Sequence, residues 1–185
     1  MELNGHPHTI TNGGGEELTF TGIKHDERGP VLVATNEVAP GDGPPMHVHH
    51  LQQEALTVLE GTLGWKGEDG VEHTVGPGET VTWEPGRAHK FWNAGDEPMR
   101  ASGEVWPPHN LEYFLTQIFE STARNGGKRP GKLDAAFLTT RYGSEFTMAE
   151  IPAPVRKVLI PVLYRLGKAL GKHERFEGAP EPIAA

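Results

Sequence analysis

The chain of 185 residues contains no cysteine. This absence excludes disulfide bonds, a thiol nucleophile and a metal site built on thiolates. The sequence also lacks an uninterrupted apolar run of about 18 residues, which a membrane-spanning helix needs, and its N-terminus has no apolar stretch typical of a signal peptide. We therefore expect a cytoplasmic protein.

Basic residues are scarce in the first part of the chain. Residues 1–107 contain 6 Lys or Arg and 17 Asp or Glu, whereas residues 108–185 contain 11 and 8, and the whole chain has a net charge of −8. Phosphate binding requires clustered cations. Because the first part is acidic and no helix-turn-helix pattern is visible, we expect no nucleic-acid partner.

Alternating polar and apolar residues predict short strands between residues 17 and 106. The 24 glycines and 16 prolines suit a turn-rich β protein. Regularly spaced short strands with turns between them indicate a barrel or a sandwich. The glycine-rich residues 1–16 precede this region, and we expect them to be a flexible segment, although a partner subunit could order a strand there.

The hydrophobic pattern changes from period two to a helical period after Pro107 and Pro108. Asn110 is a plausible N-cap for a first helix, a second helix is predicted from Leu133 to Tyr142, and Pro154 could begin a third. Residues 107–174 are therefore predicted to form a helical extension, and residues 175–185 a loose C-terminus. The apolar stripe of the first helix consists of Leu111, Phe114, Leu115, Ile118 and Phe119.

The predicted third helix is amphipathic and contains Pro161, which should kink it. A basic amphipathic helix can lie on a membrane surface, but its stripe can equally pack on the barrel or on a second subunit. We expect protein to cover the stripe, which makes a membrane partner unlikely. The stripe consists of Val155, Val158, Leu159, Val162, Leu163, Leu166 and Leu170, and the flanking cations are Lys157, Arg165, Lys168 and Lys172.

Two histidines one residue apart, His47 and His49, point to the same face if this stretch is an extended strand. Glu54 follows a polar turn and would begin the next strand beside the pair. His89, which lies after a Pro-Gly turn, is the natural third imidazole. Imidazoles and a carboxylate that converge on a point predict a metal site with open positions for a substrate or dioxygen.

Nitrogen and oxygen ligands without sulfur suit one divalent transition metal ion, which could be Fe, Mn, Ni, Co, Zn or Cu. One carboxylate leaves such a site cationic, so we expect a small chelating substrate that is anionic or enolate-like. Glu54 could also act as a proton acceptor, and it is the only catalytic residue that the sequence predicts.

These residues resemble the two motifs of the cupins. The spacing of the first motif is matched by Gly41, His47, His49, Glu54 and Gly61. The second is matched by Gly78, Gly86, His89 and Asn93, with Glu84 in place of its proline.

The resemblance implies a mainly β fold, a single cupin barrel of the double-stranded β-helix or jelly-roll type. The helical tail resembles that of bacterial single-barrel cupins, and the analogy also implies a homodimer. Similar cupins include quercetinase-like dioxygenases, oxalate-cleaving enzymes, isomerases, storage proteins and sensor domains, so the fold leaves the function open. We expect a metal-dependent, dioxygenase-like oxidoreductase; the alternatives are a non-enzymatic metal-containing binding protein and a metal-assisted isomerase of a sugar or keto acid.

Other aromatic and histidine residues have two or more interpretations. Phe91 and the four tryptophans could wall a substrate pocket or fill the core. The histidines outside the motifs are expected to be solvated or structural; they are His6, His8, His25, His50, His73, His109 and His173.

Overall fold

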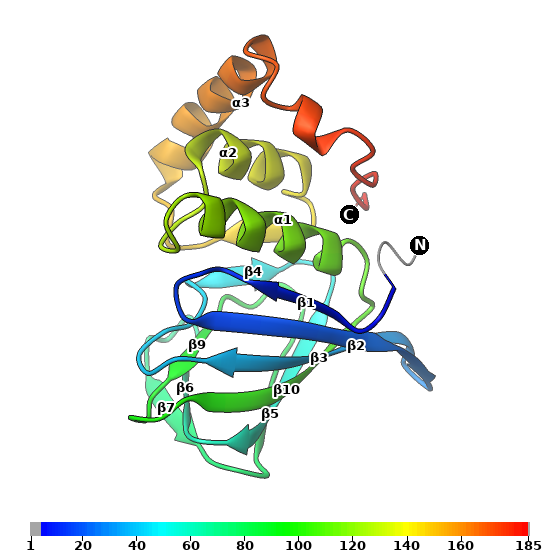
Figure 1. The fold of residues 1–185 in the computed structure, drawn as a ribbon. Coiled ribbons are helices and arrows are strands. Elements are labelled where there is room, and N and C mark those ends of the chain that lie inside the picture. Colours follow the sequence, from blue (N-terminus) through cyan, green and yellow to red (C-terminus); the bar gives the residue numbers. More distant parts are fainter. Residues whose placement is uncertain (1–4, 185) are drawn as a thin grey trace.

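A computed structural model of the chain describes residues 5–184 (Figure 1). Its strands form a layered barrel, and its helices stack on one side of that barrel. The fold is mainly β with a C-terminal helical extension, as the sequence predicts. The strands are β1 (His8–Thr11), β2 (Glu16–Asp26), β3 (Gly29–Val38), β4 (His47–His49), β5 (Gln53–Glu60), β6 (Leu63–Lys66), β7 (Glu72–Val75), β8 (Thr80–Trp83), β9 (Lys90–Asn93), β10 (Met99–Trp106) and β11 (Phe146–Met148).

The strands pair in antiparallel fashion in three sheets. The largest has the order β1-β2-β3-β10-β5-β8, a second has the order β7-β6-β9, and β11 pairs with β4. A further bridge joins His47 of β4 to His89, next to β9. Because neighbours such as β3 and β10 are far apart in sequence, the chain passes repeatedly between layers, as in a double-stranded β-helix.

Alternation along the strands sends apolar side chains into two separate cores. One core lies within the barrel and includes Leu56, Val58 and Met99. The other lies between the largest sheet and the helices, and Phe20 and Phe114 belong to it. Burying such side chains stabilises the fold by about 1.5–3 kcal/mol each.

The helices are α1 (Leu111–Arg124), α2 (Lys132–Arg141) and α3 (Ile160–Ala169). The first helix is confirmed, and Leu111, Phe114 and Phe119 of its stripe are buried. Asn110 precedes it, but its side chain makes no capping hydrogen bond. Among residues 5–184, no helix has the length and apolar character needed to cross a membrane.

The third helix differs from the expectation in two ways. The turn before it, Val155–Leu159, is π-helical. Pro161 has no N–H with which to continue an α-helical hydrogen-bond pattern, and the π-helical turn accommodates it. Its apolar stripe is largely uncovered by the described part of this chain, so the barrel does not supply the protein cover that we expected. Its exposed members are Val158, Leu159, Val162, Leu166 and Leu170.

Segments near both ends make contacts with the rest of the chain that the sequence did not predict. In the segment expected to be flexible, β1 pairs with β2 of the same chain, and Ile10 is buried in the core beside the helices. Near the other end, Phe176 stacks on Phe137 with ring centroids 4.2 Å apart, and the carbonyl of Pro180 accepts a hydrogen bond from the hydroxyl of Tyr142 at 2.9 Å. Contacts between residues far apart in the sequence, which local composition does not reveal, position these two segments.

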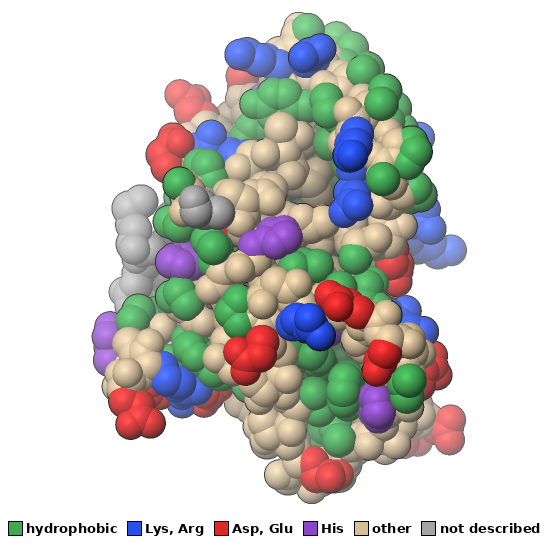
Figure 2. Space-filling model, turned by 180° about the vertical axis from the view of Figure 1, so that it is seen from behind, with side chains coloured by type: hydrophobic (Ala, Val, Ile, Leu, Met, Phe, Trp, Pro, Cys, Tyr) green, Lys and Arg blue, Asp and Glu red, His purple; other side chains and the backbone are tan. Residues whose placement is uncertain are grey.

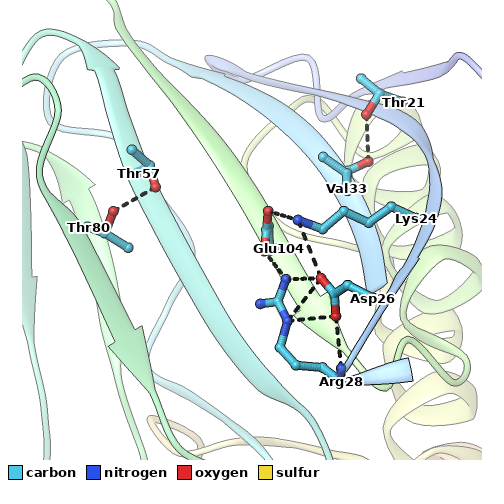
Figure 3. A network of polar contacts seen from close by, with 8 residues as sticks. All are labelled: Thr21, Lys24, Asp26, Arg28, Val33, Thr57, Thr80 and Glu104. Carbon is cyan, nitrogen blue, oxygen red and sulfur yellow. Dashed lines mark hydrogen bonds and ion pairs between the residues drawn. The ribbon is translucent and has the colours of Figure 1, made fainter. Parts of the chain in front are cut away.

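A polar network lies on the outer surface where β2, the turn between β2 and β3, and β10 meet (Figure 3). Arg28 pairs with Asp26 and with Glu104, and Lys24 also pairs with Glu104. The Arg28 guanidinium lies 4.3 Å from the ring centroid of Trp106. Because these charges are largely in contact with water, they contribute little to stability.

Candidate metal centre

Two consecutive strands and one turn position the four predicted ligands. Alternation in β4 turns His47 and His49 inward, and Glu54 occupies an inward position of β5. The backbones of His47 and His89 exchange two hydrogen bonds of 2.9 Å. The structure thus brings all four predicted residues together: one ligand atom from each lies within 4.8 Å of the others, and all four residues are buried.

The three imidazoles converge on a single carboxylate oxygen, Oε2 of Glu54. The Nε2 atoms of His89, His49 and His47 lie 3.1, 3.3 and 3.8 Å from it. This places three nitrogen donors and one oxygen donor around one point.

Backbone carbonyls orient two of the rings. Nδ1 of His47 lies 2.9 Å from the carbonyl of Pro45, and Nδ1 of His89 lies 3.0 Å from that of Arg87. A carbonyl only accepts hydrogen bonds, so each Nδ1 must carry the proton, which leaves the Nε2 lone pair for a metal. The Nδ1 atom of His49 is buried and has no hydrogen-bond partner among the described residues.

Burial and mutual charge shift the pKa values in this cluster. Burial lowers the pKa of His49 to about 3. Burial alone would raise the pKa of Glu54, but the surrounding histidines hold it well below its usual range. For His47, burial lowers the pKa, and the carboxylate of Glu54 outweighs that effect and raises it. An ionised carboxylate beside an uncharged His49 imidazole suits a cation.

These observations fit a divalent metal ion. The donors are nitrogen and oxygen, they face one point, and two of the three rings are held in a tautomer that directs Nε2 inward. The histidines outside the motifs make other contacts; for example, His50 hydrogen bonds to Thr147 at 2.8 Å, and His73 stacks on Trp65.

Two aromatic residues pack against the candidate ligands: Trp83, whose role the sequence left open, and Phe146, which sequence reasoning did not assign to the site. The Trp83 ring stacks on His89 with centroids 4.4 Å apart and an interplanar angle of 6°. Phe146 of β11 meets His49 edge-on at 5.4 Å. Trp83 and Phe91 are buried in the barrel core, which favours the structural interpretation of these aromatic side chains.

Glu16 is a further residue that the sequence analysis missed. It is buried and accepts a hydrogen bond from the Asn36 amide at 3.1 Å. Burial raises the pKa of Glu16 to about 7, and its carboxyl senses the charges of Asp42, His47 and Glu54. The sequence could have indicated its burial, because Glu16 alternates with Leu18 and Phe20 on the inward face of β2.

Comparison with known proteins agrees with this architecture. Residues 35–106 match the cupin domain family. The match covers less than half of the chain. The resemblance seen in the two motifs is therefore confirmed over that range. No curated protein sequence matches the chain.

Several solved structures resemble this chain at low identity. An uncharacterized conserved protein with a double-stranded β-helix domain from Klebsiella pneumoniae is 22% identical, with a TM-score of 0.43 over 56% of this chain and 81% of that one. A sugar phosphate isomerase of the cupin superfamily from Silicibacter pomeroyi is 23% identical, with a TM-score of 0.42 over 49% and 59%. A predicted oxalate decarboxylase from Thermotoga maritima is 19% identical, with a TM-score of 0.44 over 54% and 90%. At these TM-scores, none of them identifies a substrate for this chain.

Proposed function

We propose that this chain is a metal-dependent cupin enzyme that acts on a small organic molecule. In this proposal His47, His49, Glu54 and His89 hold one divalent transition metal ion. The observation that supports it is the buried convergence of three Nε2 atoms on Oε2 of Glu54. This set of donors suits Fe, Mn, Ni, Co, Zn or Cu.

A bound divalent ion would supply a Lewis acid that polarises an oxygen atom of the substrate. The protein residues do the rest. The carbonyls of Pro45 and Arg87 keep two imidazoles oriented, and burial of the cluster limits access of bulk water. Glu54 directs Oε2 at the imidazoles, and its other oxygen, Oε1, is the atom at which we propose that it accepts a proton.

The charge of the site favours a particular class of substrate. Glu54 is the single carboxylate of the cluster, so it would neutralise only part of the charge of a divalent ion. We propose a chelating molecule that is anionic or enolate-like. Dioxygen is the co-substrate that we favour, which makes the reaction a dioxygenase-like oxidation.

Glu16 favours a second candidate, a metal-assisted isomerase of a sugar or keto acid. Isomerisation requires a group that both takes and gives a proton, and such a group works best when its pKa is near the operating pH. Burial raises the pKa of Glu16 to about 7, and the carboxyl lies within electrostatic range of His47 and Glu54.

One set of measurements separates these functions. Metal content is determined first, and oxygen uptake is then screened with flavonols, β-diketones and small acids. Hydrogen exchange in D₂O is followed by NMR with sugars and keto acids. Oxygen uptake that is lost in Glu54→Gln supports the oxidation, and exchange without oxygen uptake supports the isomerase. Ligand binding without turnover would contradict both and indicate a non-enzymatic binding protein.

A further inference from the structure

The third helix is held to the protein by only one of its faces. On that inner face, Tyr164 stacks on Phe137 of α2 with ring centroids 6.1 Å apart. Gly167 is buried against His173, and a Cβ atom at this glycine would lie 2.6 Å from the imidazole. These contacts anchor the helix through its inner face.

The outer face of this helix is apolar and exposed. Seven large hydrophobic residues are exposed among the described residues, and five of them belong to the π-helical turn, to α3 or to its C-cap, Leu170. The five, with their exposed fractions, are Val158 (64%), Leu159 (48%), Val162 (52%), Leu166 (46%) and Leu170 (57%). A contiguous apolar patch of this kind marks an interaction site more often than chance exposure does.

The charges beside the patch all have one sign. Residues 151–173 contain five Lys or Arg and no Asp or Glu, although the whole chain has a net charge of −8. All five cations are exposed, and none forms an ion pair with a carboxylate among the described residues. They are Arg156, Lys157, Arg165, Lys168 and Lys172.

The position of the helix leaves this face accessible. In Figure 1, α3 is the helix farthest from the barrel, beyond α1 and α2. Figure 2 shows the molecule from behind, and there hydrophobic side chains with Lys and Arg beside them follow the upper edge where α3 lies. A flat surface could contact this edge without meeting the acidic barrel.

We propose that α3 and the π-helical turn before it dock on the surface of an anionic lipid bilayer. The apolar stripe enters the boundary between headgroups and acyl chains, and the neighbouring cations contact the headgroups. A second copy that covers the same face is disfavoured, because symmetric pairing of two such helices would bring their unpaired cations together. The local positive charge also overcomes the repulsion that the net charge of the chain would otherwise cause.

The test is co-sedimentation of the full chain with vesicles of equal parts phosphatidylglycerol and phosphatidylcholine. Binding is expected to weaken at high salt and to be at least about tenfold weaker with phosphatidylcholine alone. The double substitution Val162→Gln with Leu166→Gln should weaken binding by about tenfold or more. Replacing Lys168 and Lys172 by Gln should weaken it similarly and reduce its salt dependence.

A matched control uses the two exposed hydrophobic residues of the barrel. Leu59→Gln with Val71→Gln removes the same kind of side chain elsewhere, and this variant should bind vesicles as the unchanged chain does. All variants should keep the far-ultraviolet circular dichroism of the parent. Absence of vesicle binding, or an equal loss in the barrel control, would overturn the proposal. So would a dimer in sedimentation analysis that disappears in the Val162/Leu166 variant, because protein would then cover the stripe.

Discussion

Single residues set the charge of the candidate metal centre. Glu54 is the only carboxylate in a cluster of three imidazoles, and each of these has Nε2 within 3.8 Å of its Oε2 atom. The carboxylate thus carries the whole negative charge that the cluster offers to a cation.

Replacing Glu54 by Gln keeps the shape of the side chain and removes its charge. Changes to residues that merely orient a ligand already weaken metal binding by about 10–100-fold, so we expect Glu54→Gln to weaken it by more than about 100-fold. Metal content after dialysis checks this. Glu60→Gln is the matched control, since Glu60 lies at the exposed end of the same strand and pairs with Arg100. Equal metal content in both variants would refute the ligand assignment.

Glu16 should make the stability of the metal-free protein depend on pH. Burial raises its pKa from 4.5 to about 7 in the folded state, so between these values the folded chain holds a proton that the unfolded chain has released. The free energy of unfolding therefore falls as pH rises through this range. The difference between the two pKa values corresponds to a loss of about 3 kcal/mol in the free energy of unfolding.

The substitution Glu16→Gln should abolish this fall in the free energy of unfolding with rising pH. Urea unfolding with a chelator present measures the free energy of unfolding at about pH 5 and about pH 8. The variant should be more stable than the parent protein at the higher pH. Glu17→Gln, on the exposed face of the same strand, should behave like the parent protein. A parent protein whose stability does not fall over this range would contradict the prediction.

At the scale of elements, the short strand β11 connects the helical extension to β4, the strand that carries two of the candidate ligands. It pairs with β4, placing Phe146 opposite His49 and Met148 opposite His47. The residue before it, Glu145, is completely buried. Its carboxylate accepts hydrogen bonds from the side chain of Asn110 at 2.7 Å and from the backbone of Ile183 at 3.1 Å.

Glu145→Ala should therefore lower the free energy of unfolding by about 3 kcal/mol or more. The substitution removes the acceptor of two buried donors, the backbone N–H and the side-chain amide of Asn110, and each unsatisfied buried group costs about 1–3 kcal/mol. Chemical denaturation measures the change. The same substitution at Glu150, an exposed residue 3.6 Å from Lys90, should cost less than about 0.5 kcal/mol. A similar effect of both substitutions would show that Glu145 does not join the two parts.

At the scale of the whole molecule, metal binding and stability should be linked. An ion that binds only the folded chain stabilises it by about 2.7 kcal/mol at 100 times its dissociation constant. For a chain of this length that corresponds to a rise in melting temperature of roughly 5–10 °C. Thermal unfolding with metal and with chelator checks this, and Glu54→Gln should show no rise. A rise of the same size in that variant would place the ion elsewhere.

The homodimer expected from the cupin resemblance stays a prediction. Sedimentation analysis over a range of protein concentrations, without lipid, measures it directly. Any dimer should persist in the Val162/Leu166 variant, because we assign that face to lipid. A dimer that this variant abolishes would contradict the lipid assignment.

The sequence by itself indicated the candidate ligand set and determined the order of the β and α regions. His47 and His49 share a face because strand side chains alternate, and the motif spacings indicated Glu54 and His89. The stripe that includes Leu111 and Phe114 likewise specified a helix. These are local properties, since periodicity and spacing are set by the covalent chain and its backbone geometry.

Only the tertiary structure decided what each face meets. Local pattern did not show that Glu16 is buried within electrostatic range of the metal site, that Phe146 pairs opposite His49, or that Phe176 stacks on Phe137. It identified the stripe of the third helix but not its surroundings. Periodicity states which residues lie together on a face, whereas the burial of that face depends on residues distant in the chain, and here α2 takes the opposite side of the helix.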